Sequence, residues 1–527
     1  MASCFQVPDR DQVFMSAVSY REVLGDDHLV WTVIEVVDAL DMSEAYARFG
    51  VDTGQGGRPA LDPRMLLSLL IFGYREGKRS SRELEEACGR DWAYRAICAD
   101  MAPDHATIAR FRQRHSDLIP GWFAQVLTIC REAGLVDVET VAVDGTKMKA
   151  AASKGSNRTA ETLKRLEAEA RTMLDEAADA DTSPDPGSGG GRRSSESRRD
   201  TEAARRAERI REAARVVADA ETRRVAEEKK RGKRKRPVAN VTDPDSRVMK
   251  TADGGWIQGF NAQAVTTADQ MVIAAVVTCD PTDVGWFEPM FTTARANLDT
   301  AGIDTPIGVG LADAGYWSAA NATAATGLTN NMLIATTKSH QVGTVTIDDE
   351  TITRDTTRIE VIEEIVAGRV TVTDAARLLG LSTSRVRVLV SRYRNHATLE
   401  SPETMIRRQM ETKMADPANR DRYRQRGWLI EGCFAHVKVH RRSAGFLRRG
   451  LAAVNAEWQL MHLAGNIDKL HRHRLNGPSP TDPGRPQTGH TRLQQAPIGC
   501  RGRFNARQDR HRARQNPSRH TSRPAHR

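Results

Sequence analysis

Apolar side chains recur at helical spacing through the first 130 residues of the chain. The run Met65–Phe72 is almost entirely apolar and begins two residues after Pro63, a residue that is tolerated in the first turn of a helix, so a buried helix is predicted there. Ser80 followed by Glu83 has the spacing of a capping box and predicts the start of another helix. Residues 1–130 are therefore expected to form an all-helical domain.

Segment 104–115 adds a further short helix, with cations on one side and Ile108 and Phe111 available for packing. Two short helices followed by a basic one are typical of helix-turn-helix proteins, which place the last helix in the major groove of DNA. A plain helical bundle explains the same pattern, so both interpretations stay open. The side chains that would contact DNA are Arg110, Arg112 and Arg114.

The pattern becomes strand-like after residue 136. Residues 138–143 alternate and then become continuously apolar, which predicts a strand that ends at Asp144 and Gly145. Two further predicted strands, 256–266 and 271–278, are joined by a short polar turn and therefore form a hairpin.

An amphipathic helix over 283–298 follows, and then a strand over 306–313 and a possible fifth strand over 332–336. The order strand, hairpin, helix, strand resembles the skeleton of an RNase H-like mixed sheet. We therefore expect an α/β fold, in which an RNase H-like mixed sheet flanked by helices is combined with an all-α N-terminal domain and helical insertions.

Two insertions are expected within this core. Residues 160–237 are rich in Ala, Glu and Arg at helical spacing around a flexible linker at 183–191, which predicts two charged helices that are consistent with a coiled-coil hairpin. Residues 355–398 resemble a second helix-turn-helix, in which Gly380 makes the turn and Ser382 caps the last helix. A helical structural insert is the alternative. The candidate DNA-binding residues of this segment are Arg385 and Arg387.

The positive charge of the chain is concentrated near its end. The net charge is +10, and residues 471–527 hold 13 Arg, no Lys, two Asp and no Glu, so the preceding body is close to neutral. This low-complexity segment is expected to be a disordered basic tail. Within the body, seven of the eight residues in 229–236 are Lys or Arg. Such clustered cations suit contacts with phosphates, although a solvated arm explains them equally well.

Composition also excludes several classes of protein. The seven cysteines are scattered and include no C-x-x-C pair, which argues against a disulfide framework and against a zinc site. No apolar run approaches the ~20 residues of a membrane span, and neither a phosphate-binding glycine loop nor a nucleophile elbow occurs. We expect a cytoplasmic protein without membrane contact and without a nucleotide cofactor.

Acidic residues follow two of the predicted strands. Asp144 and Asp313 would both be delivered to the same edge of one sheet, and carboxylate oxygens held in this way suit Mg²⁺. Glu431, in a predicted helix, is well placed to supply a third carboxylate. Lys438 lies seven residues later, two turns along the same helix face, so it could contact a DNA phosphate beside the metal site.

A set of motifs in this order resembles the DDE transposases of bacterial insertion sequences. The motifs are Val141–Lys147, Leu311–Tyr316 and Tyr423-x-x-Arg426 followed by Glu431-x6-Lys438, with supporting stretches at 58–63, 242–250, 259–263 and 466–469. The resemblance covers residues 30–470. It implies that Asp144, Asp313 and Glu431 are a metal-binding catalytic triad for two Mg²⁺ ions, for which Mn²⁺ would substitute.

The same resemblance implies the activity and the partners. A DDE transposase cleaves double-stranded DNA at the terminal inverted repeats of its element and transfers the ends to target DNA, with two metal ions assisting phosphoryl transfer. The N-terminal domain and the second helix-turn-helix would recognise the repeats, and the pairing of two ends favours a homodimer. The catalytic core would be built from residues 131–159, 238–345 and 415–470.

One departure from the family pattern concerns Arg426. The family signature of tyrosine, arginine, glutamate and lysine has three residues between arginine and glutamate, whereas four separate Arg426 from Glu431. In a continuous helix this spacing turns Arg426 about 140° away from Glu431. Either Gly427 begins the helix and Arg426 reaches the site from a loop, or Arg426 has no catalytic role. Tyr423, Arg426 and Lys438 are the candidate DNA contacts of this segment.

Two other functions compete with transposition. The chain could be a non-catalytic DNA-binding protein, either a regulator or a decayed transposase copy, and the shift in composition at residue 471 gives this alternative some support. A DNA nuclease without strand transfer is also compatible with the triad. The intact Asp144, Asp313 and Glu431 favour the transposase.

Overall fold

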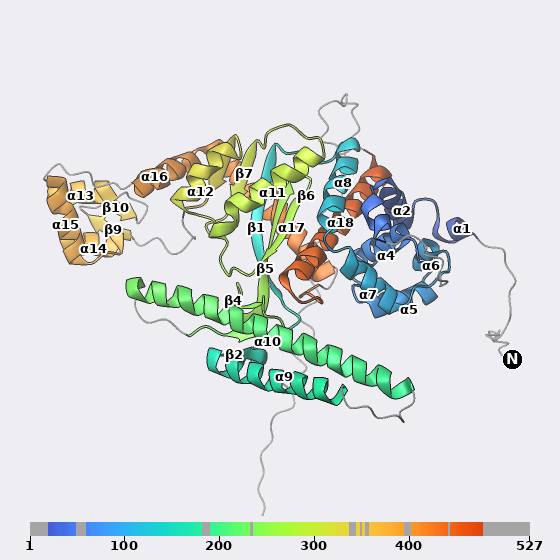
Figure 1. Cartoon of the computed structure of the whole chain (residues 1–527). Coiled ribbons are helices and arrows are strands. Elements are labelled where there is room, and N and C mark those ends of the chain that lie inside the picture. Colours follow the sequence, from blue (N-terminus) through green and yellow to red (C-terminus); the bar gives the residue numbers. More distant parts are fainter. Residues whose placement is uncertain are drawn as a thin grey trace, which may run out of the picture. The chain divides into compact units, whose positions relative to one another are not determined.

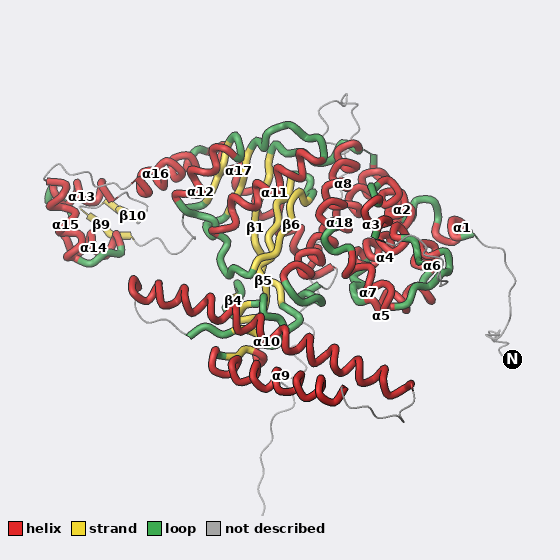
Figure 2. The backbone as a smooth tube through the Cα atoms, viewed as in Figure 1, coloured by secondary structure: helices red, strands yellow, loops and turns green. Residues whose placement is uncertain are grey.

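The computed structural model describes nine stretches of the chain, and the elements are shown in Figure 1 and Figure 2. The described residues are 19–48, 60–181, 190–231, 236–336, 344–347, 350–353, 358–394, 402–440 and 443–477. All described residues belong to one compact unit, which ends at residue 477, and the rest of the predicted tail lies outside the described residues. Within the described stretches no helix combines the length and the apolar character needed to cross a membrane.

The N-terminal region is helical, as predicted. Its helices are α1 Tyr20–Leu24, α2 Leu29–Ala39, α3 Ser43–Ala47, α4 Pro63–Arg75, α5 Ser81–Arg90, α6 Trp92–Cys98, α7 His105–Arg114 and α8 Ile119–Glu132. Ser80 and Glu83 form the predicted capping box at the start of α5. The side chains of α4 are buried from Met65 to Tyr74 because the apolar run leaves no polar face for solvent.

A mixed sheet forms the core, and it is the expected RNase H-like sheet. Its strands are β1 Thr140–Lys149, β4 Arg247–Lys250, β5 Trp256–Thr267, β6 Val272–Thr278, β7 Val309–Ala312 and β8 Asn331–Ile334. The order is β4-β5-β1-β7-β8, and β6 pairs with β5. Strand β5 runs antiparallel to β1, β4 and β6, whereas β1, β7 and β8 are parallel. The hairpin of β5 and β6 is confirmed, and β4 was not predicted.

Strand β1 is longer than predicted. It was expected to end at Asp144 and Gly145, but it continues to Lys149 because β5 pairs with it along this whole length. Its other neighbour, β7, pairs only with residues 140–143. Asp144 therefore marks the point at which β1 loses its parallel neighbour rather than the end of the strand.

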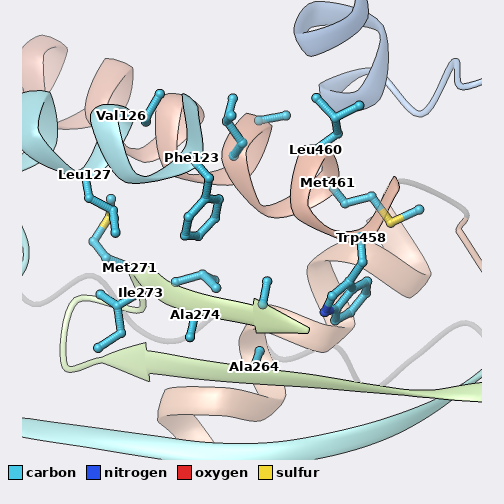
Figure 3. Packing of buried hydrophobic residues seen from close by; sticks show 14 of the residues in the cluster. Phe123, Val126, Leu127, Ala264, Met271, Ile273, Ala274, Trp458, Leu460 and Met461 are labelled. Atoms are coloured by element: carbon cyan, nitrogen blue, oxygen red, sulfur yellow. The ribbon is translucent and has the colours of Figure 1, made fainter. Parts of the chain in front are cut away.

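Helices cover the sheet and join it to the N-terminal region. Helix α11 (Phe287–Thr300) contacts β5 and β6, helix α17 (Pro417–Ala435) contacts β1, β5 and β7, and helix α18 (Leu451–Asn476) contacts β6, α8, α4 and α2. Figure 3 shows side chains of α8, β6 and α18 meeting, among them Phe123, Ile273 and Trp458. One hydrophobic core thus includes both the N-terminal helices and the sheet.

Helix α18 also completes the hydrogen bonding of an edge strand. The Asn466 side chain accepts from the Val272 backbone N–H (3.0 Å) and donates to the Val272 carbonyl (2.8 Å), and Asn455 Oδ1 accepts from Val277 N–H (2.9 Å). Exposed strand edges promote pairing with other chains. These amides therefore close the β6 edge. The helix runs to Asn476, past residue 471, so the first residues of the predicted tail are helical.

The two insertions are helical. The first contains α9 Ala160–Asp181 and α10 Gly190–Arg231, closed at its base by β2 Asn157–Arg158 and β3 Ala239–Asn240. The linker was predicted at 183–191. Residues 182–189 lie outside the described residues, and the last two residues of the predicted linker belong to α10, which begins at Gly190. The second contains α13 Arg358–Val366, α14 Val372–Leu379 and α15 Thr383–Arg394, which share a separate small core.

The remaining elements connect these parts. They are the hairpin β9 Thr344–Ile347 and β10 Glu350–Thr353, helix α12 Ala319–Ala324, helix α16 Pro402–Ala415, a π-helical turn over His436–His440, and 3₁₀ turns at 154–156, 284–286 and 325–327. Helix α17 passes directly into the π-helical turn.

Candidate active site

Two carboxylates meet at one edge of the sheet. The parallel pairing of β1 with β7 ends at Val143 and Ala312, and Asp144 and Asp313 are the next residues on the two strands. Each carboxylate accepts a hydrogen bond from a backbone N–H close to it in the sequence, Asp144 from Gly145 at 2.7 Å and Asp313 from Gly315 at 2.8 Å. The structure therefore brings Asp144 and Asp313 together, as the strand pattern predicted.

The environment of Asp144 is unfavourable for its own charge. The pKa of Asp144 is raised to about 6, mainly by burial and also by the neighbouring Asp313, although Arg426 opposes both effects. Because the pKa of Asp144 stays raised despite the neighbouring arginine, this carboxylate lacks sufficient positive charge around it. The oxygen donors of the two aspartates fit Mg²⁺, which proteins commonly hold through one or two carboxylates with the remaining positions left to water and substrate phosphate.

Arg426 reaches this pair from the middle of a helix. Its Nη1 donates to Asp144 Oδ2 at 3.0 Å, and both side chains are about four-fifths buried. Helix α17 is continuous from Pro417 to Ala435, so the alternative in which Gly427 begins the helix is wrong. Tyr423, one turn earlier, donates its hydroxyl to the Ala312 carbonyl at 3.2 Å and so fixes α17 to the end of β7.

In the part of the chain that the structure describes, no polar contact joins Glu431 to Asp144 or Asp313. Glu431 is exposed, and its Oε1 lies 3.5 Å from the position that a Cβ atom on Gly427 would take. Among the described residues its carboxylate makes no hydrogen bond or ion pair, and no three His, Cys, Asp or Glu side chains are grouped closely enough to hold a metal. Because α17 is continuous, the side chains of Arg426 and Glu431 leave the helix in directions about 140° apart. Arg426 is the one that faces Asp144.

Lys438 points toward the site although Glu431 does not. Its Nζ donates to Thr146 Oγ1, two residues beyond Asp144 on β1. Burial lowers the pKa of Lys438, and the negative charge of Asp144 opposes this change. The prediction that Lys438 and Glu431 share one helix face assumed a regular α-helix. The π-helical turn at 436–440 changes the rotation per residue between them, which explains the difference.

Five further polar residues lie near the two carboxylates, and the sequence pattern predicted no role for any of them. They are Lys147, Asn261, Gln263, Asp283 and Tyr316. A signal was present in the segment Gly259–Gln263, where the amide residues Asn261 and Gln263 alternate with apolar residues. A buried strand with polar groups on one face indicates a polar network beneath it.

The candidate DNA-contacting residues of the N-terminal region divide into two groups. Arg110 and Arg114 are exposed on α7. Arg112 faces inward instead, where its Nη1 donates to the Arg79 carbonyl at 2.7 Å and to the Tyr74 hydroxyl at 3.4 Å. Arg112 therefore holds α7 against α4, a role that depends on tertiary packing and is not visible in the sequence pattern.

The second helix-turn-helix has the predicted local geometry. Gly380 ends α14 with a φ of +64°, which glycine adopts without strain, and Ser382 Oγ accepts from Arg385 N–H at 3.3 Å. Arg385 and Arg387 are exposed in the first turns of α15. This is where a recognition helix places the side chains that read base edges.

Three protein-family models match the chain. The model described as Transposase domain (DUF772) matches residues 18–114, and the model described as Helix-turn-helix domain matches residues 357–399. The model described as Transposase DDE domain matches residues 389–471, a range that includes Glu431 and Lys438. In the same comparisons, no curated protein and no solved structure matches the chain.

Proposed function

Because its three domain matches make this protein a DNA-binding transposase of the insertion-sequence DDE class, we propose that it cuts DNA at the terminal inverted repeats of its element and joins those ends to target DNA. The observation that carries the proposal is the meeting of Asp144 and Asp313 at the point where two parallel strands separate. We place this activity in the cytoplasm, where a bacterial genome is accessible.

We propose that the activity requires divalent cations. Asp144 and Asp313 would hold Mg²⁺, or Mn²⁺ in its place, and Glu431 is the proposed third ligand. Two such ions, when bound, supply positive charge at the attacking and leaving oxygens of a phosphoryl transfer. Glu431 is exposed, which leaves its carboxylate accessible for this role.

The chain's own residues add cations beside the carboxylates. Arg426 contacts Asp144 directly, and Lys438 is held at Thr146 on the same strand. A DNA phosphate at this edge of the sheet would meet both positive groups, which would position the backbone without reading its sequence. Burial keeps their hydration low, so their electrostatic effect on a phosphate is larger than it would be on an open surface.

Removal of metal tests the proposed activity. The substrate is a supercoiled plasmid that carries the gene's own flanking DNA, incubated with Mg²⁺, with Mn²⁺ or with a chelator. We expect cuts at the element boundaries with either metal and none with the chelator. Binding without cutting would instead indicate a non-catalytic DNA-binding protein, and cutting without joining would indicate a nuclease.

Recognition of the repeats is proposed for both helical DNA-binding regions, with two copies of the chain holding two element ends. In the second region, Arg385 and Arg387 lie at the start of α15, where base edges are read. Phosphate contacts of α7 through Arg110 and Arg114 would supply affinity that does not depend on sequence.

Substituting Arg385 or Arg387 with alanine should weaken binding to the terminal repeat by about 10- to 100-fold, because each base contact contributes about 1 to 3 kcal/mol. Affinity for unrelated DNA should change much less. Arg377→Ala is the matched control, since Arg377 is exposed on the preceding helix and faces Asp374 at 3.4 Å. Equal losses on both DNAs, measured by fluorescence anisotropy at one fixed salt concentration, would contradict a role in base reading.

A further inference from the structure

A third carboxylate, that of Asp283, lies near Asp144 and Asp313, and buried side chains hold it in place. Asp283 belongs to the loop between β6 and α11. Its Oδ1 accepts hydrogen bonds from Asn261 Nδ2 and Gln263 Nε2, both at 2.7 Å, and lies 3.2 Å from Lys147 Nζ. Asn261 and Gln263 are fully buried. Three donors at these distances restrict the carboxylate to one orientation.

This network lies on the face of β1 opposite to the candidate metal ligand. Side chains alternate between the faces of a strand, so Gly145 and Lys147 project away from the side on which the preceding aspartate meets α17. The register pairs Gly145 with Gln263 and Lys147 with Asn261. A Cβ atom on Gly145 would lie 2.6 Å from Asp283 Oδ1, so the missing side chain lets Asp283 approach the backbone of β1.

The other oxygen of Asp283 lies against the loop that follows β7. A Cβ atom on Gly315 would lie 3.3 Å from Asp283 Oδ2 and 2.9 Å from Asp313 Oδ1. The next residue, Tyr316, is fully buried and donates its hydroxyl to Gln263 Oε1. The loop that carries Asp313 is therefore fixed to the same amide that Asp283 binds.

A second contact joins the two loops directly. The Asn321 side chain donates to the Val284 carbonyl and to the Tyr316 carbonyl, both at 2.7 Å. The loop after β6 and the loop after β7 are thereby connected through one amide. Asp283 lies between this connection and the strand that carries Asp144, so it contacts the neighbours of both candidate metal ligands.

We propose that Asp283 is a positioning residue, which holds the backbone after Asp144 and the loop after Asp313 in a fixed relation and thereby sets the affinity of the pair for a divalent cation. The inference rests on the proposed function, because it concerns the same metal site. Residues that support metal ligands from behind typically change metal affinity by about 10- to 100-fold when they are replaced.

The test measures Mn²⁺ binding to the full-length protein without DNA, by titration with electron paramagnetic resonance detection of the free ion. Asp283→Ala should weaken binding by about 10- to 100-fold. Asp283→Asn should weaken it less, since its amide oxygen can still accept from Asn261 and Gln263. The matched control is Asp280→Asn, because Asp280 lies in the same loop but is exposed and accepts from Trp286 Nε1 at 2.9 Å.

Asp144→Asn serves as the reference for loss of a ligand. Wild-type affinity in Asp283→Ala, together with lost binding in Asp144→Asn, would overturn the positioning role and leave the metal site intact. Loss in Asp283→Asn as severe as in Asp144→Asn would make Asp283 a ligand and overturn the proposal as well. A wild-type protein that binds no Mn²⁺ would overturn the proposed metal site and this inference with it. Circular dichroism checks that each variant is folded. If Asp283→Ala does not fold, the Mn²⁺ affinity of Asp283→Asn is compared with that of the wild type instead, and an unchanged affinity would overturn the proposal.

Discussion

Replacing Asp144 or Asp313 with asparagine should lower cleavage at the element ends on the order of 1,000-fold. Asparagine has nearly the same shape and keeps an oxygen that can accept from Gly145 N–H or Gly315 N–H. What it removes is the negative charge. DNA binding should therefore persist, since the proposed contacts with the repeats lie on other elements.

Unfolding should not explain the loss in Asp144→Asn. The folded-state pKa of Asp144 is raised to about 6, above its ordinary value of 3.8. A raised carboxyl pKa means that ionisation at neutral pH costs folding free energy, and that this cost appears as the pH rises from about 4 to above 6. Asparagine removes the cost, so the variant should melt at or above the wild-type temperature at pH 7.5.

The control for these variants is Asp304→Asn, which removes an exposed carboxylate shortly before β7. It should cleave as the wild type does. An electrostatic contact at a reacting centre typically contributes about 100- to 1,000-fold to the rate. If Asp144→Asn and Asp313→Asn cleaved the plasmid at rates within about 10-fold of this control, neither aspartate would be a metal ligand of the reaction.

Breaking the buried ion pair between Arg79 and Glu457 should destabilise the fold by about 3 to 5 kcal/mol. Arg79 follows α4, Glu457 lies on α18, and Arg79 Nη1 donates to Glu457 Oε1 at 2.7 Å. Both side chains are more than nine-tenths buried. The same carboxylate accepts from the backbone N–H groups of Leu447 and Arg448, so Arg79→Met would leave a buried charge without its directly bonded guanidinium.

Urea denaturation of Arg79→Met, Glu457→Gln and the double variant measures this effect. The double variant should lose less free energy of unfolding than the sum of the two single variants, because each single variant leaves one buried charge without its counter-charge and the double variant leaves neither. Arg90→Met is the control, since Arg90 pairs with Glu86 on the surface of α5 and exposed pairs contribute about 0 to 1 kcal/mol. A loss in Arg79→Met no larger than in the control would show that the pair does not stabilise the fold.

The sequence pattern predicts the parts of the site that depend on local order. An apolar strand followed by an aspartate is visible in one segment, and two such segments at neighbouring parallel strands place Asp144 and Asp313 at one edge. The capping box at Ser80 and the turn at Gly380 are similarly local. These features need only strand alternation and backbone geometry, which the residues themselves determine.

Other features depend on contacts between segments that are far apart in the sequence, and the pattern of apolar and polar residues does not show which segments meet. The π-helical turn that separates the directions of Glu431 and Lys438 has no local sequence signal that we recognised. The inward position of Arg112 follows from the carbonyl of Arg79, which becomes its partner only after α4 and α7 pack. The role of Asp283 requires the register of β1 with β5, which is a tertiary property.

The closure of the β6 edge by α18 has a consequence for synthesis of the protein on the ribosome. About 200 residues separate the end of β6 from the end of α18. At roughly 5 to 20 residues per second, the edge therefore waits roughly 10 to 40 s for Asn455 and Asn466 to reach it. A message cut short before this helix would leave the strand edge open to pairing with other chains, and its product would be an aggregating fragment rather than a smaller working enzyme.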